Sequence, residues 1–326
     1  MYSSLKSSLR DKVEMVSHFK NLILYPSRKL VILLYHRILP TPFSNPLGTL
    51  VSVHNFKKQL QFLKKNYQLV SLSEALLSIK DKSKDSASKI KIVITFDDGY
   101  ADNYKYAFPV LKELEINASF FLATDYIGKG KPIWDWKLYL LLSSSQNNII
   151  LRDDLNNKLI ERKDYKGKEH QFLWKLINIL KYLPPETRSL LLREVTNQLN
   201  IDGMDYKEDR CMSWDEAREM QDNGMEFGSH GLSHTSLRDL SQDSIDRELN
   251  ESWEKIRLEL NPQNKYFALP FGSDNDFSKS IITSIRDNGY NNCLLNVKGV
   301  NSCKQEQFSL KRKIVMDSPN LKAILG

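Results

Sequence analysis

The chain has 326 residues, of which 41% are hydrophobic and 27% charged, a balance typical of soluble globular proteins rather than disordered or fibrous ones. The net charge is +7, but no run of basic residues is longer than the three at 311–313, so a nucleic-acid binder is the weakest functional hypothesis. The longest apolar run, residues 30–35, falls far short of the roughly 20 residues that span a bilayer.

The cysteines and the N-terminal segment indicate a cytoplasmic protein. Cys211, Cys293 and Cys303 have neither the spacing of a disulfide framework nor that of a zinc finger, which suits a reducing compartment. Charged residues interrupt the N-terminal segment where a signal peptide would need an apolar stretch. Residues 1–29 predict a helical extension that either lies on the protein surface or makes a peripheral contact with a membrane or a partner.

The first half of the chain alternates between apolar strands and amphipathic helices. Expected strands cover residues 30–35, 68–71, 91–96 and 117–123, and expected helices lie near residues 56–66, 72–79 and 109–114. Ser71 and Glu74 form a capping box at the start of the second helix. This alternation predicts a parallel sheet, either open or closed into a barrel.

The alternation stops between residues 128 and 210, where the pattern is helical. Ser213 and Glu216 form a second capping box, and strands are expected again at 225–228, 266–269, 291–295 and 309–315. Residues 128–210 are therefore predicted to form an α-helical insertion into an α/β domain.

Two adjacent acids, Asp97 and Asp98, directly follow the β-branched strand expected at 91–96, in the sequence KIVITFDDGY. Burial of carboxylates at the end of a strand costs free energy unless a positive charge compensates theirs, and a bound metal ion commonly supplies that charge. Successive strand residues point to opposite faces, so both acids reach one site only if the strand ends there and Gly99 turns the backbone. This favours a site in which one acid binds a metal and the other lies beside it. It disfavours the glycosidase arrangement, in which two acids flank one bond.

Nitrogen ligands for such a metal are found at His230 and His234, in the sequence EFGSHGLSH. Their i, i+4 spacing predicts that both lie on one face of a helical turn. Two imidazoles and one carboxylate form a facial set with open positions, so we expect a divalent ion, zinc first, with cobalt, nickel or manganese as alternatives.

TFDDGY at 95–100 and SHGLSH at 229–234 resemble the first two motifs of the polysaccharide deacetylase family, also called NodB homology or carbohydrate esterase family 4. FALPFG at 267–272 resembles the third motif, and LLYHRI at 33–38 resembles a branch found in capsule and exopolysaccharide gene sets. The resemblance implies a distorted, incomplete (β/α) barrel with its site at the C-terminal strand ends. The expected organisation is an extension at 1–29, a barrel at 30–127 and 211–317, the insertion at 128–210 and a tail at 318–326.

The resemblance also assigns roles to individual residues. It implies Asp97 as the general base, Asp98, His230 and His234 as metal ligands, and Pro270, Phe271 and Gly272 as substrate-binding residues. Tyr100, at the end of the first motif, is also expected to line the substrate groove. Two positions depart from the family. Ala268 stands where an arginine usually orients the base, and no histidine follows His234 to act as the late general acid; the segment at 310–312 offers a cation instead.

His36, at the end of the first strand, is the candidate for the missing acid. A histidine with a pKa near its ordinary value of about 6.5 suits this role, although His36 could equally hydrogen-bond a neighbouring loop. Trp134 and Trp136 either stack on sugar rings or anchor the insertion, and anchoring is favoured.

The sequence thus predicts a metal-dependent hydrolase that removes the N-acetyl group of an amino sugar in a surface-polysaccharide or glycoconjugate pathway. Its partner would be an N-acetylated sugar or polysaccharide precursor. Two alternatives remain: another amide or ester hydrolase on the same scaffold (a deformylase or O-deacetylase), and a pseudoenzyme that binds carbohydrate without turnover.

Overall fold

Within the residues that the structure describes, eight parallel strands form the main sheet, in the order β1-β12-β11-β10-β9-β6-β5-β4. The computed structural model describes residues 30–41, 47–80, 90–153, 158–201, 203–302 and 305–319. Because β1 also pairs with β5, seven strands close into a barrel and β4 extends it on the outside of β5. The expected extension at 1–29 and most of the expected tail lie outside the described residues.

The strands and helices have the following bounds. The sheet contains β1 (Leu30–Tyr35), β4 (Gln68–Leu69), β5 (Lys91–Phe96), β6 (Ser119–Leu122), β9 (Glu226–Ser229), β10 (Tyr266–Ala268), β11 (Asn292–Leu295) and β12 (Leu310–Ile314). Around it lie α2 (Val53–Asn66), α3 (Leu72–Lys80), the π-helix η2 (Asn103–Ala107), α4 (Phe108–Glu113), α8 (Trp214–Asp222), α9 (Gln242–Leu260), α10 (Lys279–Asp287) and the 3-10 helix η4 (Gln307–Ser309). β2 (Arg37–Leu39) pairs with β3 (Leu50–Ser52) in a separate small sheet. These elements confirm the predicted (β/α) barrel.

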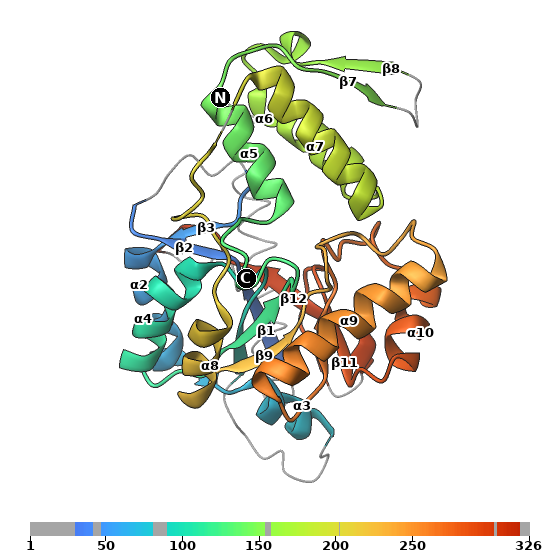
Figure 1. Ribbon diagram of the computed structural model, residues 1–326. Coiled ribbons are helices and arrows are strands. Elements are labelled where there is room, and N and C mark those ends of the chain that lie inside the picture. Colours follow the sequence, from blue (N-terminus) through green and yellow to red (C-terminus); the bar gives the residue numbers. More distant parts are fainter. Residues whose placement is uncertain are drawn as a thin grey trace, which may run out of the picture.

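The barrel interior is filled by alternate apolar side chains of its strands. One buried cluster joins Ile32, Val93, Phe121 and Leu294 from four strands with residues of α3, which closes the bottom of the barrel in Figure 1. Gly228 on β9 makes room for this packing, because a Cβ there would lie 2.7 Å from the Phe121 ring. A filled interior leaves the rim of the barrel as the place for chemistry.

Both predicted capping boxes are present. Ser71 N–H donates to the Glu74 carboxylate (3.0 Å), and Glu74 N–H donates to Ser71 Oγ (3.2 Å). The same reciprocal pair, Ser213 with Glu216, starts α8 at 2.7 and 3.2 Å. Each box satisfies two backbone groups that a helix end would otherwise leave without partners.

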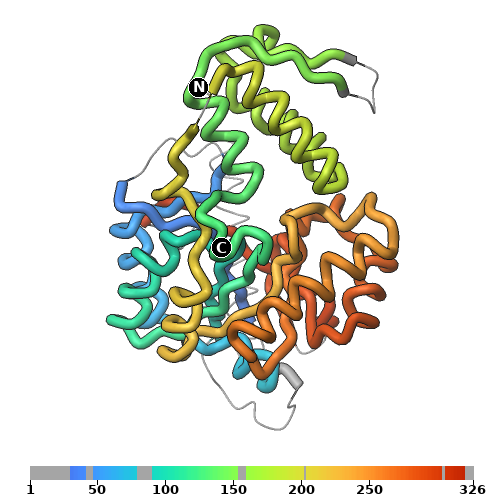
Figure 2. Tube along the Cα trace, in the orientation of Figure 1, coloured from blue at the N-terminus to red at the C-terminus, as the bar shows by residue number. Residues whose placement is uncertain are grey.

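The insertion lies over the end of the barrel opposite α3, as Figures 1 and 2 show. It consists of α5 (Trp134–Ser144), β7 (Ile150–Asp153), β8 (Lys158–Glu161), the 3-10 helix η3 (Arg162–Tyr165), α6 (Glu169–Leu180) and α7 (Pro185–Leu199). β7 and β8 form an antiparallel hairpin, so the expectation of a purely helical insertion was incomplete. Among the described residues, no helix is both long and apolar enough to cross a membrane.

Candidate active site

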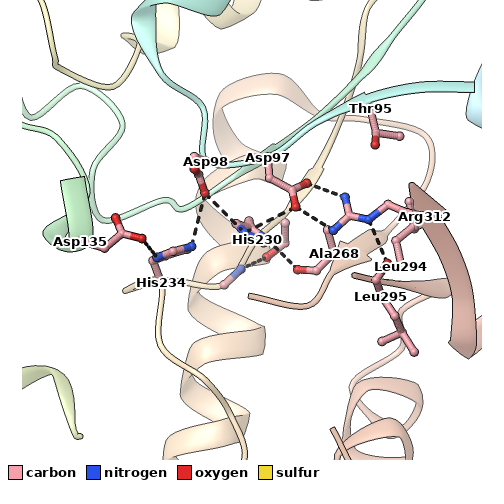
Figure 3. A network of polar contacts seen from close by, with 12 residues as sticks. Thr95, Asp97, Asp98, Asp135, His230, His234, Ala268, Leu294, Leu295 and Arg312 are labelled. Atoms are coloured by element: carbon pink, nitrogen blue, oxygen red, sulfur yellow. Dashed lines mark hydrogen bonds and ion pairs between the residues drawn. The ribbon is translucent and has the colours of Figure 1, made fainter. Parts of the chain in front are cut away.

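Asp97 and Asp98 meet His230 and His234 just beyond the ends of β5 and β9 (Figure 3). Asp98 and Gly99 have left-handed φ values of 78° and 81°. This turn brings two consecutive acids to one site, which a continuing strand would not allow. A Cβ at Gly99 would lie 2.7 Å from the Leu122 side chain, so the turn requires glycine at this position.

The segment from His230 to His234 is a loop, and the helical turn expected from the i, i+4 spacing was wrong. Gly231 and His234 have φ values of 76° and 53°, which a right-handed helix excludes. The carboxylate of Glu248 on α9 accepts hydrogen bonds from Leu232 N–H (2.8 Å) and Ser233 N–H (3.0 Å). A buried acid that the sequence did not single out therefore fixes the loop that carries both histidines.

Three atoms form a triangle that fits a metal ion. Asp98 Oδ1 lies 3.5 Å from His230 Nε2 and 3.3 Å from His234 Nε2, and ligand atoms of the three residues lie within 4.8 Å of one another. Two ligands each about 2.1 Å from one ion at a tetrahedral angle are about 3.4 Å apart. Asp98 Oδ1 is buried and has no hydrogen-bond partner among the described residues. These residues therefore fit a divalent ion.

Burial sets the protonation of these groups in a way that suits a metal. Desolvation lowers the pKa of His230. Desolvation also lowers the pKa of His234, and the nearby His230 and Arg188 add to this effect, so that the pKa of His234 lies well below its usual value. Both imidazoles are therefore neutral, the form that binds metals. Desolvation, Asp135 and Asp97 raise the pKa of Asp98 well above its ordinary value, so a cation would relieve an unfavourable buried charge.

The Nδ1 atoms of the two histidines, which point away from the metal triangle, lie in different surroundings. His230 Nδ1 lies 2.8 Å from the backbone oxygen of Ala268; with its hydrogen there, Nε2 is free to bind an ion. His234 Nδ1 is buried and has no hydrogen-bond partner among the described residues, but Asp135 Oδ2 lies 3.8 Å away. Burial raises the pKa of Asp135 to about 6. Asp135 comes from α5, so the insertion contributes to the metal site, which no sequence pattern had indicated.

Arg312 holds the predicted base. Its guanidinium donates two hydrogen bonds of 2.7 Å to the two carboxylate oxygens of Asp97, and its Nε donates to Leu295 O (3.2 Å; Figure 3). Burial raises the pKa of Asp97, but Arg312 and His230 outweigh it, so the pKa lies below the ordinary value. Arg312 on β12 thus pairs with Asp97, the role that the resemblance assigns to an arginine in place of Ala268. Strand alternation was the available signal, because Leu310 and Arg312 share one face.

His36 lines the same cavity as Asp97, Asp98, His230 and His234. Its Nδ1 is buried without a hydrogen-bond partner in the described part of the chain. The expectation that its pKa stays near 6.5 was wrong, because burial lowers the pKa to about 4, with Arg312 and His230 acting in the same direction against Asp97. The imidazole is therefore neutral at neutral pH, and its role as the acid remains a prediction.

Trp134 and Trp136 anchor the insertion. The two residues are only 2% and 4% exposed, and their indole N–H groups donate at 2.7 Å to His234 O and to Asp209 Oδ1, respectively. Arg37 completes the anchor, since its guanidinium pairs with Asp209 (2.7 Å) and stacks on Trp136, 4.3 Å from the ring centroid. Both ends of the insertion are therefore fixed to the barrel.

The predicted substrate-binding residues differ in where they lie. Tyr100 and Phe271 line the cavity, whose volume is about 320 Å³. Phe271 also packs on the His234 ring, 4.8 Å between centroids. Pro270 and Gly272 shape the turn, with Gly272 N–H donating to Pro270 O (2.7 Å), and a Cβ at Gly272 would lie 2.8 Å from Leu269 O.

Comparison with known proteins identifies relatives of this arrangement. A family model described as polysaccharide deacetylase matches residues 84–293, more than half of the chain. A putative polysaccharide deacetylase, YxkH of Bacillus subtilis, is 38% identical over 101 residues, which cover 31% of this chain and 34% of that protein. A poly-β-1,6-N-acetyl-D-glucosamine N-deacetylase of Staphylococcus epidermidis is 33% identical over 119 residues, which cover 32% of this chain and 39% of that protein. The matched segments thus span about a third of the length of these curated relatives.

Solved structures share the fold at low sequence identity. The Streptococcus pyogenes deacetylase PplD in complex with acetate superposes with a TM-score of 0.58 at 19% identity, covering 93% of this chain and all of that one. IcaB from Ammonifex degensii gives a TM-score of 0.59 at 17% identity, covering 92% of this chain and 96% of that one. At these identities the likeness shows a common barrel fold.

Proposed function

The chain belongs to the polysaccharide deacetylase family, and we propose that it is a metal-dependent N-deacetylase that hydrolyses the acetamido group of an amino sugar. The observation that carries this proposal is the triangle of Asp98, His230 and His234 with an ionised Asp97 beside it. The relative from Staphylococcus epidermidis that is named for poly-β-1,6-N-acetyl-D-glucosamine supports a related substrate here, a surface polysaccharide or its precursor.

The roles of the residues follow from their environment. A divalent ion held by Asp98, His230 and His234 would supply Lewis acidity, which lowers the pKa of a water molecule and polarises an acyl carbonyl. Asp97, kept ionised by Arg312, accepts the proton of the attacking water. The zinc-type donor set of two imidazoles and one carboxylate leaves positions for water and substrate.

Completion of the reaction requires a proton on the leaving nitrogen. Water oxygen adds to the carbonyl carbon, the carbon–nitrogen bond breaks, and acetate and a free amine leave. We propose that the proton taken up by Asp97 reaches the nitrogen through His36, which lines the same cavity. Because the pKa of His36 is about 4, this relay starts from a neutral imidazole rather than from a resident imidazolium.

Of the alternative functions, the pseudoenzyme loses part of its support. It rested on the missing motif arginine and the missing late histidine, and Arg312 now supplies the cation that holds Asp97. The choice between amide and ester hydrolysis is tested by incubating the protein with matched N-acetyl and O-acetyl glucosamine oligomers and measuring acetate and free amine together. Equimolar acetate and amine support the proposal; acetate release from the ester alone would replace it with an O-deacetylase.

We also propose a cytoplasmic location, supported by two cysteines, Cys211 and Cys293, that are free and buried. A precursor sugar on the cytoplasmic side of the membrane would then be the substrate. Fractionation of cells that express the chain tests this point, and recovery of the protein outside the cytoplasmic membrane would contradict it.

A further inference from the structure

One face of helix α6 in the insertion lines the cavity that holds the candidate catalytic residues. Trp174, Ile177 and Asn178 of α6 line the cavity together with Lys181, which caps the helix in a helical conformation; their spacing i, i+3, i+4, i+7 places them on a single face. The cavity therefore has a wall that comes from the insertion and not from the barrel.

A buried ion pair fixes this wall beside the metal site. Lys181 Nζ pairs with Asp276 Oδ1 at 2.9 Å, and the side chains are 9% and 0% exposed. Lys181 also lies 5.1 Å from the centroid of the Phe271 ring, and that ring packs on His234. The Phe271 ring thus contacts both the predicted metal ligand His234 and Lys181, which places the C-terminal end of α6 beside the metal site.

The chemistry of the α6 face suits a sugar ring. Trp174 is half-buried, and its indole N–H donates to His170 Nε2 on the same helix (3.0 Å). Asn178 is exposed one turn further on, and its side-chain amide makes no hydrogen bond within the described ranges. An aromatic face binds the C–H face of a pyranose, and an amide both donates to and accepts from hydroxyl groups.

We propose that Trp174 and Asn178 form a subsite for a second sugar residue, the neighbour of the one that carries the acyl group. The occupant is a pyranose in an amino-sugar chain of at least two units. This inference rests on the proposed function, because it places the acetamido group at the metal site, and it assigns to the insertion a preference for oligomeric substrate.

The test compares chain-length dependence in matched variants. Turnover of the N-acetylglucosamine monosaccharide and of its β-1,6-linked dimer and trimer is measured for the wild type, Trp174→Ala and Trp174→Phe. Trp214→Ala is the control, because Trp214 is also half-buried but does not line the cavity. We expect kcat/KM to rise from monomer to dimer in the wild type, and Trp174→Ala to lose about three- to tenfold on the dimer through KM, with the monomer unchanged. Trp174→Phe should recover part of the loss.

Two results would overturn the subsite. One is an equal loss on monomer and dimer, which would make Trp174 merely structural; the other is no loss on either. If the wild type turns over none of these amides, the proposed function fails, and the subsite is then judged by calorimetric binding of the trimer. Weaker binding to Trp174→Ala than to Trp214→Ala would support it, and equal binding would refute it.

Discussion

Replacement of Arg312 by methionine tests how the catalytic base is held. The Arg312–Asp97 pair is bidentate at 2.7 Å, and its side chains are 0% and 3% exposed. Loss of one partner from such a buried pair costs about 3–5 kcal/mol, because the other charge stays buried without compensation. We expect Arg312→Met to lower Tm by on the order of 5–10 °C at neutral pH.

The pH dependence separates a catalytic effect from a structural one. In the wild type the pKa of Asp97 lies below its ordinary value, so the ion pair stabilises the fold above the unfolded pKa and this stabilisation is lost as pH falls through the folded pKa. Arg312→Met removes the main group that opposes burial, so the pKa of Asp97 should rise. The acid limb of kcat/KM should therefore move to higher pH, with turnover about 10²-fold lower at neutral pH and partly restored in alkaline buffer.

A matched control comes from Arg37, a second buried arginine, which pairs with Asp102 and Asp209 instead. Arg37→Met should lower Tm by a similar amount without moving the acid limb. The reasoning is refuted if Arg312→Met loses stability but retains the wild-type acid limb, because Asp97 would then not be the base. An unchanged Tm would show that the pair contributes no stability.

Three further variants address single residues. Asp97→Asn should keep the bound metal and the fold while cutting turnover by about 10²-fold or more at every pH, and near wild-type turnover would remove Asp97 from the mechanism. We propose that Asp135, whose Oδ2 lies 3.8 Å from His234 Nδ1, orients that ring once the ion is bound, so Asp135→Asn should weaken metal affinity by about 10- to 100-fold in a chelator competition; an unchanged dissociation constant would show that it does not. His36→Gln should lower turnover without loss of metal and without change in the shape of the pH–rate profile, whereas loss of an alkaline limb would show that His36 is protonated in the resting enzyme.

The sequence predicted the barrel and the metal triangle for a common physical reason. Apolar runs bounded by polar residues mark parallel strands, and the C-terminal ends of such strands meet at one rim. Asp98 and His230 lie within two residues of the ends of two of these strands, so their proximity could be deduced without coordinates. The capping boxes at Ser71 and Ser213 are local patterns and were predicted for the same reason.

The parts that could not be predicted depend on long-range contacts. Arg312 and Asp97 are 215 positions apart, and only closure of β12 against β1 brings them together. Asp135 reaches His234 because the insertion folds back over the rim, which its own sequence does not show. The helical turn expected at 230–234 failed because Glu248, on a later helix, stabilises a loop that the spacing of the histidines cannot reveal.

Metal reconstitution coupled to product release tests the central claim most directly. Metal-free protein is titrated with Zn²⁺ while bound metal and released acetate are measured on an N-acetylglucosamine oligomer, beside the double variant His230→Ala/His234→Ala. We expect activity to rise in proportion to bound metal and to saturate at one ion per chain, and the double variant to bind no stoichiometric ion and remain inactive. Full activity in the metal-free protein, or one retained ion per chain in the double variant, would contradict the site assigned to Asp98, His230 and His234.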